Sequence, residues 1–154
     1  MVVDVALARH RHARRIVEVG IGRRPATARA LRHALPATQV VAVDNDESVV
    51  AQHGREPYPV LWDDVLMPRW AIYRGASLIY AVHPPPELLP ALARLAEGVA
   101  AELVCVHLHG ESGCYQGPGW APVVVEGRVA AWRRGGQAGP DPPGPRAVTG
   151  HATA

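Results

Sequence analysis

The stretch Ile16-Val17-Glu18-Val19-Gly20-Ile21-Gly22 decides the fold, because a short β-branched run ends here in two closely spaced glycines. The residues that follow, 25–35, are rich in Ala, Leu and Arg. Pro25 suits a first helical turn, where its missing N–H would have no intrahelical partner, and Pro36 ends the segment. The sequence therefore predicts a strand at 16–19, a glycine turn and a helix at 25–35.

The same alternation of strand and helix continues along the chain. Apolar and β-branched runs predict strands at 39–43, 58–62, 77–82 and 102–108, with helices at 46–52 and 86–97. The continuous apolar run at 103–106, in which Cys105 is a small hydrophobe, favours a strand covered on both faces. Together these segments predict an α/β fold with a Rossmann-like, doubly wound and mostly parallel sheet.

The two ends of the chain differ from this alternating middle. Residues 4–15 have helical composition and end in a basic cluster, residues 9–15, that either contacts phosphates or forms a solvated helix face. Residues 122–125 and 128–132 flank Glu126-Gly127 and predict an antiparallel hairpin at the sheet edge. Residues 135–154 are rich in Gly and Pro, so we expect one domain over 1–134 and a disordered tail over 135–154.

The composition is typical of a soluble globular domain. The chain has 154 residues, 48% of them hydrophobic, and no apolar run approaches the roughly 18 residues that a membrane span needs. Two cysteines without CxxC spacing, and basic residues that follow the N-terminal apolar run, argue against a disulfide framework and a secretory signal. We therefore expect a cytoplasmic protein without a membrane partner. A net charge of +2 allows a nucleic-acid partner without indicating one, and the oligomeric state stays open.

Polar or turn-forming residues follow nearly every predicted strand, at the edge where parallel sheets bind ligands. Gly20 and Gly22 lack the Cβ atoms that would keep a ligand away from the backbone. Asp44 follows them at close to the spacing of about 20 residues at which a carboxylate accepts hydrogen bonds from ribose hydroxyls. Pro25 stands where the dinucleotide fingerprint needs a third Gly or Ala, which counts against NAD. The favoured cofactor is S-adenosylmethionine, which has no pyrophosphate.

Five segments, taken in order, resemble an uncharacterised archaeal family of the UPF series whose members are predicted Rossmann-like methyltransferases dependent on S-adenosylmethionine. They are residues 16–22, 43–44, 63–65, 78–88 and 108–111, and the stretch from Tyr80 to Leu88 is the most specific. By comparison with such methyltransferases, the resemblance implies that Glu18, Gly20 and Gly22 surround the methionine part of the cofactor. It also implies that Asp44 binds the ribose and that Asp64, or its neighbour Asp63, binds the adenine amine.

The resemblance also draws attention to His83-Pro84-Pro85-Pro86. These residues fall where amine methyltransferases carry an Asn-Pro-Pro-aromatic signature, but His83 replaces the amide and Pro86 replaces the aromatic residue. The resemblance therefore places Pro84 and Pro85 at the cofactor site without implying transfer to nitrogen. His83 is the candidate catalytic residue, because imidazole accepts protons near neutral pH, and the alternative is a rigid strand-to-helix turn.

Four residues of metal-ligand type follow the fifth predicted strand: His107, His109, Glu111 and Cys114. Their spacing matches no recognised zinc pattern, and polar residues are expected around any ligand pocket, so no metal site is predicted.

The leading hypothesis is a domain that binds S-adenosylmethionine and transfers its methyl group to an unknown small molecule, RNA or protein. The alternative is a non-catalytic sensor of a cofactor or nucleotide, because little sequence remains for a substrate domain. NAD-type binding and metal-dependent hydrolysis rank below both.

Overall fold

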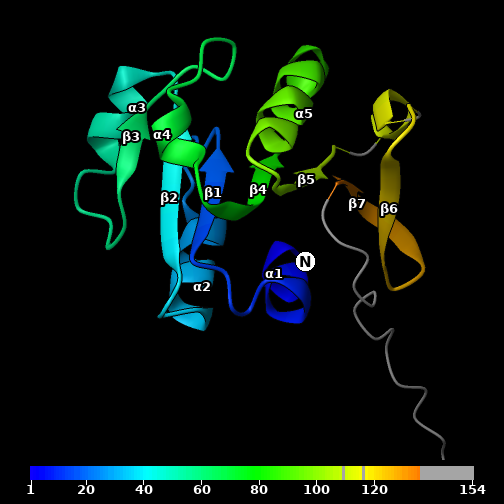
Figure 1. The fold of residues 1–154 in the computed structure, drawn as a ribbon, viewed down its shortest axis with the longest axis horizontal. Helices are drawn as coiled ribbons and strands as arrows, with labels where there is room; N and C mark the ends of the chain where they lie inside the picture. The colour runs from blue at the N-terminus through cyan, green and yellow to red at the C-terminus, as the bar shows by residue number, and fades with distance from the viewer. Residues whose placement is uncertain (109, 116, 136–154) are drawn as a thin grey trace, which may run out of the picture.

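A seven-stranded sheet forms the centre of the computed structural model, which describes residues 1–108, 110–115 and 117–135 (Figure 1). Its strand order is β3-β2-β1-β4-β5-β7-β6. The strands are β1 (Arg15–Val19), β2 (Gln39–Asp44), β3 (Val60–Trp62), β4 (Ala76–Val82), β5 (Glu102–Val106), β6 (Trp120–Val125) and β7 (Arg128–Arg134). The first five strands pair in parallel, whereas β7 runs antiparallel to both β5 and β6.

Helices cover both faces of this sheet. One face packs against α1 (Val2–Arg9), α2 (Ala26–Ala34) and α3 (Glu47–Gln52), and the other against α4 (Trp70–Tyr73) and α5 (Leu89–Gly98). The 3₁₀ turns η1 (Pro86–Leu88) and η2 (Ser112–Tyr115) complete the described elements. Because side chains alternate along a strand, Ile16 joins the first core and Val17 joins the second.

The structure confirms the predicted Rossmann-like class, the mostly parallel sheet and the antiparallel C-terminal hairpin. The hairpin turn has positive φ at both Glu126 (49°) and Gly127 (74°), as a two-residue turn requires. The later strand, β7, lies inside the sheet next to β5, and β6 forms the edge.

Several element boundaries differ from the predicted ones. The first helix ends at Arg9, with His10 as its C-cap, so the basic residues 11–15 belong to a loop and to the start of β1. The predicted strands at 58–62 and 102–108 are shorter, and α4 has no counterpart among the predicted elements. Residues 136–154, which make up nearly all of the expected tail, lie outside the described residues.

Within the described ranges, no helix is long and apolar enough to cross a membrane.

Candidate functional site

The carboxyl ends of β1 to β5 meet at one edge of the sheet, the upper edge in Figure 1, toward which the arrow of β1 points. Loops at this edge carry every site residue that the sequence predicted and the structure describes, except Glu18, which lies within β1, and Asp44, which is the last residue of β2. The edge is therefore the candidate binding site, in agreement with where parallel α/β sheets bind ligands.

The glycine turn is locked against the end of β2. The backbone N–H groups of Gly20 and Ile21 both donate to the carbonyl oxygen of Val43, at 2.9 and 3.1 Å. Gly20 and Gly22 have φ of 73° and 60°, a conformation that other residues rarely adopt. A Cβ added at either glycine would meet no atom of the described residues within 4 Å, apart from its chain neighbours, so the space beside this turn is open there.

Asp44 connects the glycine turn to the loop after β2. Its Oδ2 accepts the N–H of Gly22 at 2.9 Å, and its Oδ1 accepts the N–H of Asp46 at 3.0 Å. The side chain is half-buried, so water still reaches it. Each carboxylate oxygen has a second lone pair, which leaves Asp44 able to accept two further hydrogen bonds from neighbouring hydroxyls.

Asp63 and Asp64, adjacent in sequence, have different surroundings. Asp63 is buried and accepts hydrogen bonds from the Tyr73 hydroxyl at 2.6 Å and from the backbone N–H of Arg69 at 3.1 Å. Burial, followed by these contacts with Asp63, raises the pKa of Tyr73 well above its usual value. Asp64 is half-buried and its Oδ1 accepts the N–H of Leu66 at 2.9 Å. Asp63 thus fixes the loop from inside, whereas Asp64 keeps contact with solvent.

Trp62 was not among the predicted site residues. It pairs with Asp44 in the β2–β3 register, and its Nε1–H donates to the carbonyl oxygen of Asn45 at 2.9 Å. Its side chain is 44% exposed, so part of the ring reaches solvent. The signal in the sequence is its position at the end of the third predicted strand, which places a flat aromatic surface beside Asp44.

His83 immediately follows β4, and its backbone N–H donates to the carbonyl oxygen of Val106 at 2.7 Å. This bond fixes the backbone of His83 to the end of β5, while its side chain is exposed. The φ of His83 is 53°, a conformation that costs free energy outside glycine and that concentrates at functional sites. Pro84 is buried, Pro85 is exposed and Pro86 begins η1, so the rigid strand-to-helix turn is also present.

Glu18 lies in the interior beneath the glycine turn. Its side chain is 2% exposed, and its Oε2 accepts the hydroxyl of Tyr80 at 2.8 Å. Burial raises the pKa of Glu18 from 4.5 to about 7, although the bond from Tyr80 acts in the opposite direction. Glu18 therefore changes its charge near neutral pH.

The residues considered as metal ligands do not converge in the part of the chain that is described. His107 is half-buried with its ring against Tyr115, Glu111 accepts the N–H of Leu108 at 3.3 Å, and Cys114 is exposed. His109 lies outside the described residues. No group of three or more His, Cys, Asp or Glu within the described ranges could hold a metal ion.

The sheet order, the glycine turn after β1 and the acidic residue that ends β2 define the chain as a Rossmann-like protein with a methyltransferase-type fold. TrmN from Thermus thermophilus has this fold with a TM-score of 0.61 and 17% identity, over 86% of this chain and 47% of TrmN. The antibiotic-resistance methyltransferase Kmr has a TM-score of 0.54 and 15% identity, over 88% of this chain and 93% of Kmr. Coclaurine N-methyltransferase was solved with N-methylheliamine and S-adenosylhomocysteine (SAH). It has a TM-score of 0.52 and 15% identity, over 69% of this chain and 34% of its own chain. This chain thus spans less than half of the TrmN and coclaurine N-methyltransferase chains.

Residues 2–116 match the family described as Uncharacterised protein family (UPF0146), and the chain belongs to this family. The UPF0146 protein of Archaeoglobus fulgidus is 40% identical over 97 residues, which cover 63% of this chain and 70% of that protein. The family match confirms the resemblance that residues 16–111 indicated.

Proposed function

We propose that this protein binds S-adenosylmethionine at the carboxyl edge of β1, β2 and β3 and transfers its methyl group to an acceptor near the end of β4. The observation that carries the proposal is the contact between Asp44 and the N–H of Gly22. It holds a carboxylate at the mouth of an open glycine turn, where a ribose would need it. The structure of coclaurine N-methyltransferase with SAH, the demethylated product of this cofactor, supports the choice of ligand.

Each part of the cofactor has a proposed place. The backbone of Gly20 and Gly22 surrounds the methionine part, and Asp44 accepts hydrogen bonds from the ribose hydroxyls. Asp64 accepts the adenine amine, because it is the member of the pair that reaches solvent, and Asp63 holds the loop in place. The exposed ring of Trp62 covers the adenine. Glu18 supports the glycine turn from the buried side, and Pro84 and Pro85 shape the wall below the sulfonium.

The bound cofactor supplies a methyl group on a sulfonium that is already reactive, so the protein mainly needs to hold donor and acceptor in line. His83 is the proposed proton acceptor. The imidazole of His83 is exposed, and the hydrogen bond from its backbone N–H to β5 fixes the position of the backbone at the edge of the site. The prolines that follow His83 restrict the movement of this backbone further.

The second candidate function is a non-catalytic sensor of the same cofactor. Pro86 favours it, because Pro86 begins η1 at the position where amine methyltransferases carry an aromatic residue for the target. The comparison with Kmr favours a catalytic function over a sensor. Kmr is described as a methyltransferase, and this chain covers 93% of the length of Kmr.

Thermal unfolding in the presence of SAH tests the cofactor. A ligand at about 100 times its dissociation constant adds about 2.7 kcal/mol to the free energy of unfolding. For a domain of this size we expect Tm to rise by roughly 5–10 °C. Asp44→Asn and Asp44→Ala should remove this rise, and the exposed control Asp4→Ala should keep it. No rise with either S-adenosylmethionine or SAH, or a rise with NAD alone, would contradict the proposal.

Methyl-labelled cofactor separates enzyme from sensor. The protein is incubated with labelled S-adenosylmethionine and a cell extract, and labelled products are identified. An enzyme should label an acceptor, and His83→Ala should slow that labelling by about 100-fold while SAH still raises Tm. Cofactor binding without any labelled acceptor would identify the sensor.

A further inference from the structure

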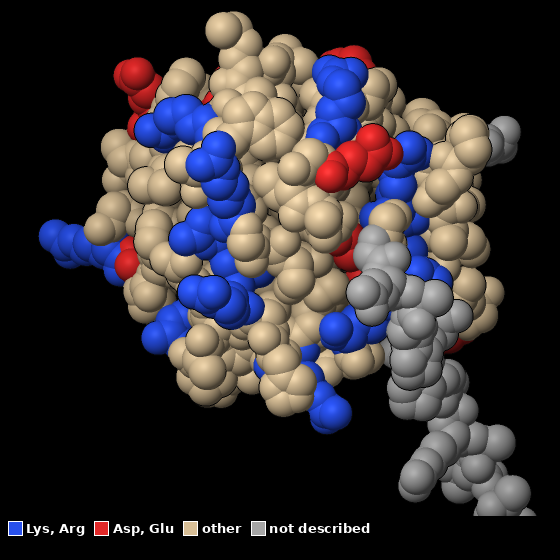
Figure 2. All heavy atoms as spheres, viewed as in Figure 1, with Lys and Arg blue, Asp and Glu red and all other residues tan. Residues whose placement is uncertain are grey.

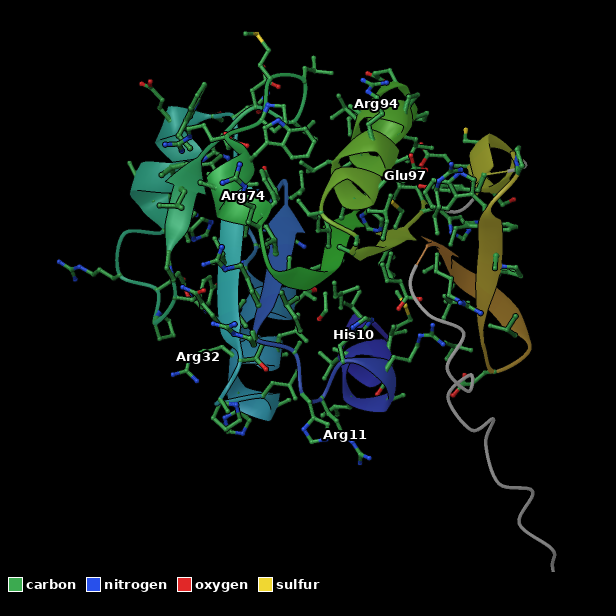
Figure 3. All side chains as sticks on the ribbon, in the orientation of Figure 1. His10, Arg11, Arg32, Arg74, Arg94 and Glu97 are labelled. Atoms are coloured by element: carbon green, nitrogen blue, oxygen red, sulfur yellow. The ribbon has the colours of Figure 1, made fainter. Side chains whose placement is uncertain are left out.

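A hollow of about 270 Å³ lies at the opposite, amino-terminal edge of the sheet. It is lined by residues 8–13, which end α1 and form the following loop, and by Ser77 of β4. Figure 3 shows His10 and Arg11 at this end of the molecule, with Arg11 extending outward at the lower edge. None of the residues proposed for the cofactor lines this hollow.

Ser77 occupies a β-bulge. Arg15 and Ile16 of β1 pair with Ala76 and Leu78 of β4, so Ser77 is an extra residue with no partner across the strands. Bulges re-aim a side chain and are frequent beside binding sites. The Oγ of Ser77 is buried and has no hydrogen-bond partner among the described residues, although such groups are nearly always paired. A ligand that accepts a hydrogen bond in the hollow would satisfy this hydroxyl.

The surroundings of the hollow are basic and firmly held. Arg9 Nε and His10 Nε2 both contact Oε2 of buried Glu102, at 3.1 and 2.6 Å, and Arg133 Nη1 lies 3.6 Å from Oε1. One carboxylate thus holds two guanidinium groups and a histidine in place. Arg11 brings a further positive charge to this edge, because it is exposed and forms no ion pair with a described residue.

The lower edge in Figure 2, where Arg11 lies, shows several basic side chains and few acidic ones. Positive charge, a guanidinium with parallel N–H donors and an unpaired hydroxyl are the groups that recognise phosphate oxygens. The same charge disfavours a cation.

We propose that this hollow binds a phosphate group, with Ser77 Oγ and Arg11 as donors and Glu102 holding Arg9 and His10 in place beside it. The phosphate belongs either to a small phosphate or to a nucleic-acid backbone, because both present the same oxygens. The site is independent of the cofactor proposal, since it lies at the other edge of the sheet and uses other residues.

Calorimetric titration of the full chain at low salt, without cofactor, tests this site. The probes are inorganic phosphate and a ten-nucleotide single-stranded RNA of mixed sequence. Ser77→Ala and Arg11→Ala should each weaken binding of inorganic phosphate by about tenfold, because each removes one donor to a charged group. Arg128→Ala, at an exposed position on the C-terminal hairpin, is the matched control and should bind like the original protein.

The two probes distinguish the source of the phosphate. RNA that binds more tightly than inorganic phosphate, and loses affinity in the same two variants, would assign the site to a nucleic-acid backbone. Phosphate binding without that gain would assign it to a small phosphate. Failure of both probes to bind, or binding that Arg11→Ala and Ser77→Ala leave unchanged, would overturn the proposal. Arg11 is exposed, so its variant remains informative if Ser77→Ala lowers stability.

Discussion

The Glu18 carboxyl group illustrates, at the scale of one residue, how burial determines charge. It is 2% exposed and bonded to the hydroxyl of Tyr80, and burial is the larger influence on it. The pKa of Glu18 is therefore raised from 4.5 to about 7. Between pH 4.5 and about 7, Glu18 is therefore mostly protonated in the folded protein and mostly ionised in the unfolded chain.

This raised pKa predicts a stability that decreases as pH rises. Between the unfolded pKa of 4.5 and the folded pKa of about 7, the folded state binds more protons, so the free energy of unfolding falls with pH. The total contribution of Glu18 is on the order of 3 kcal/mol, and it is lost above about pH 7. Glu18→Gln cannot ionise, so its stability relative to the original protein should rise by roughly this amount from pH 4.5 to 8.

Urea denaturation of both proteins across this pH range measures the difference. Glu97→Gln serves as the control, because Glu97 is 57% exposed and pairs with Arg134 at the surface. Its stability should stay parallel to that of the original protein above pH 6. Parallel pH profiles for Glu18→Gln and the original protein would show that Glu18 ionises normally.

The sequence predicts individual residues well where the signal is local. Gly20, Gly22 and Asp44 are recognisable from short-range patterns, and the structure places Gly22 and Asp44 in direct contact. The partner of Glu18 is not recognisable, because Tyr80 lies 62 positions away in β4. The different surroundings of Asp63 and Asp64 also depend on the folded chain, which brings Tyr73 to Asp63. The roles proposed for these residues at a cofactor remain predictions.

At the scale of elements, buried Glu102 ties the first helix to the centre of the sheet. It is the first residue of β5, is 1% exposed and contacts Arg9 and His10 at the end of α1. Burial by itself raises the pKa of Glu102, but the hydrogen bonds and the electrostatic attraction of His10 and Arg9 together outweigh it, so the pKa is lowered overall. The carboxylate thus contributes stability above its unfolded pKa of 4.5 and loses it as pH falls through the lowered value.

Glu102→Ala should destabilise the protein by about 3–5 kcal/mol, because it leaves the buried Arg9 guanidinium without this carboxylate. Hydrogen exchange should show the amides of α1 losing protection before those of β1. Glu97→Ala removes an exposed partner of Arg134 and should cost no more than about 1 kcal/mol. Equal losses in the two variants, measured by urea denaturation at pH 7, would contradict a special role of Glu102.

Helices and strands with a clear hydrophobic period, or with Gly or Pro at their ends, can be predicted from the sequence. Elements that depend on tertiary packing cannot. The strand, glycine turn and helix at the start of the sheet follow from the sequence within one or two residues. The four-residue helix α4 is too short to show a helical period, and Arg15 stabilises its end by donating to the carbonyl oxygens of Ala71, Ile72 and Arg74. That contact joins segments far apart in the chain.

At the scale of the whole molecule, the order of the strands in the sheet could not be predicted completely from the sequence. The hairpin is recognisable from Glu126-Gly127, but insertion of β7 between β5 and β6 depends on which strand covers the open edge of β5. The family match ends at residue 116, so the hairpin completes the sheet outside the matched part.

The sheet also separates the two proposed sites, which leads to a prediction about their coupling. Asp44 and the glycine turn lie at the carboxyl edge, and Ser77 and Arg11 lie at the amino edge, with no shared residue. Distant sites without shared partners contribute independently to binding. Saturating phosphate should therefore change the dissociation constant of SAH by less than about twofold, and SAH should change phosphate affinity by the same factor.

Calorimetry with both ligands, in either order, measures this coupling. Asp44→Ala should lose SAH binding and keep phosphate binding, whereas Ser77→Ala should keep SAH binding and weaken phosphate binding by about tenfold. A change of more than about fivefold in either affinity would mean that the sheet transmits a structural change between its edges. Strands β1 and β4 run from one edge to the other and pair along their length, so the bulge at Ser77 lies on a direct connection between the two edges.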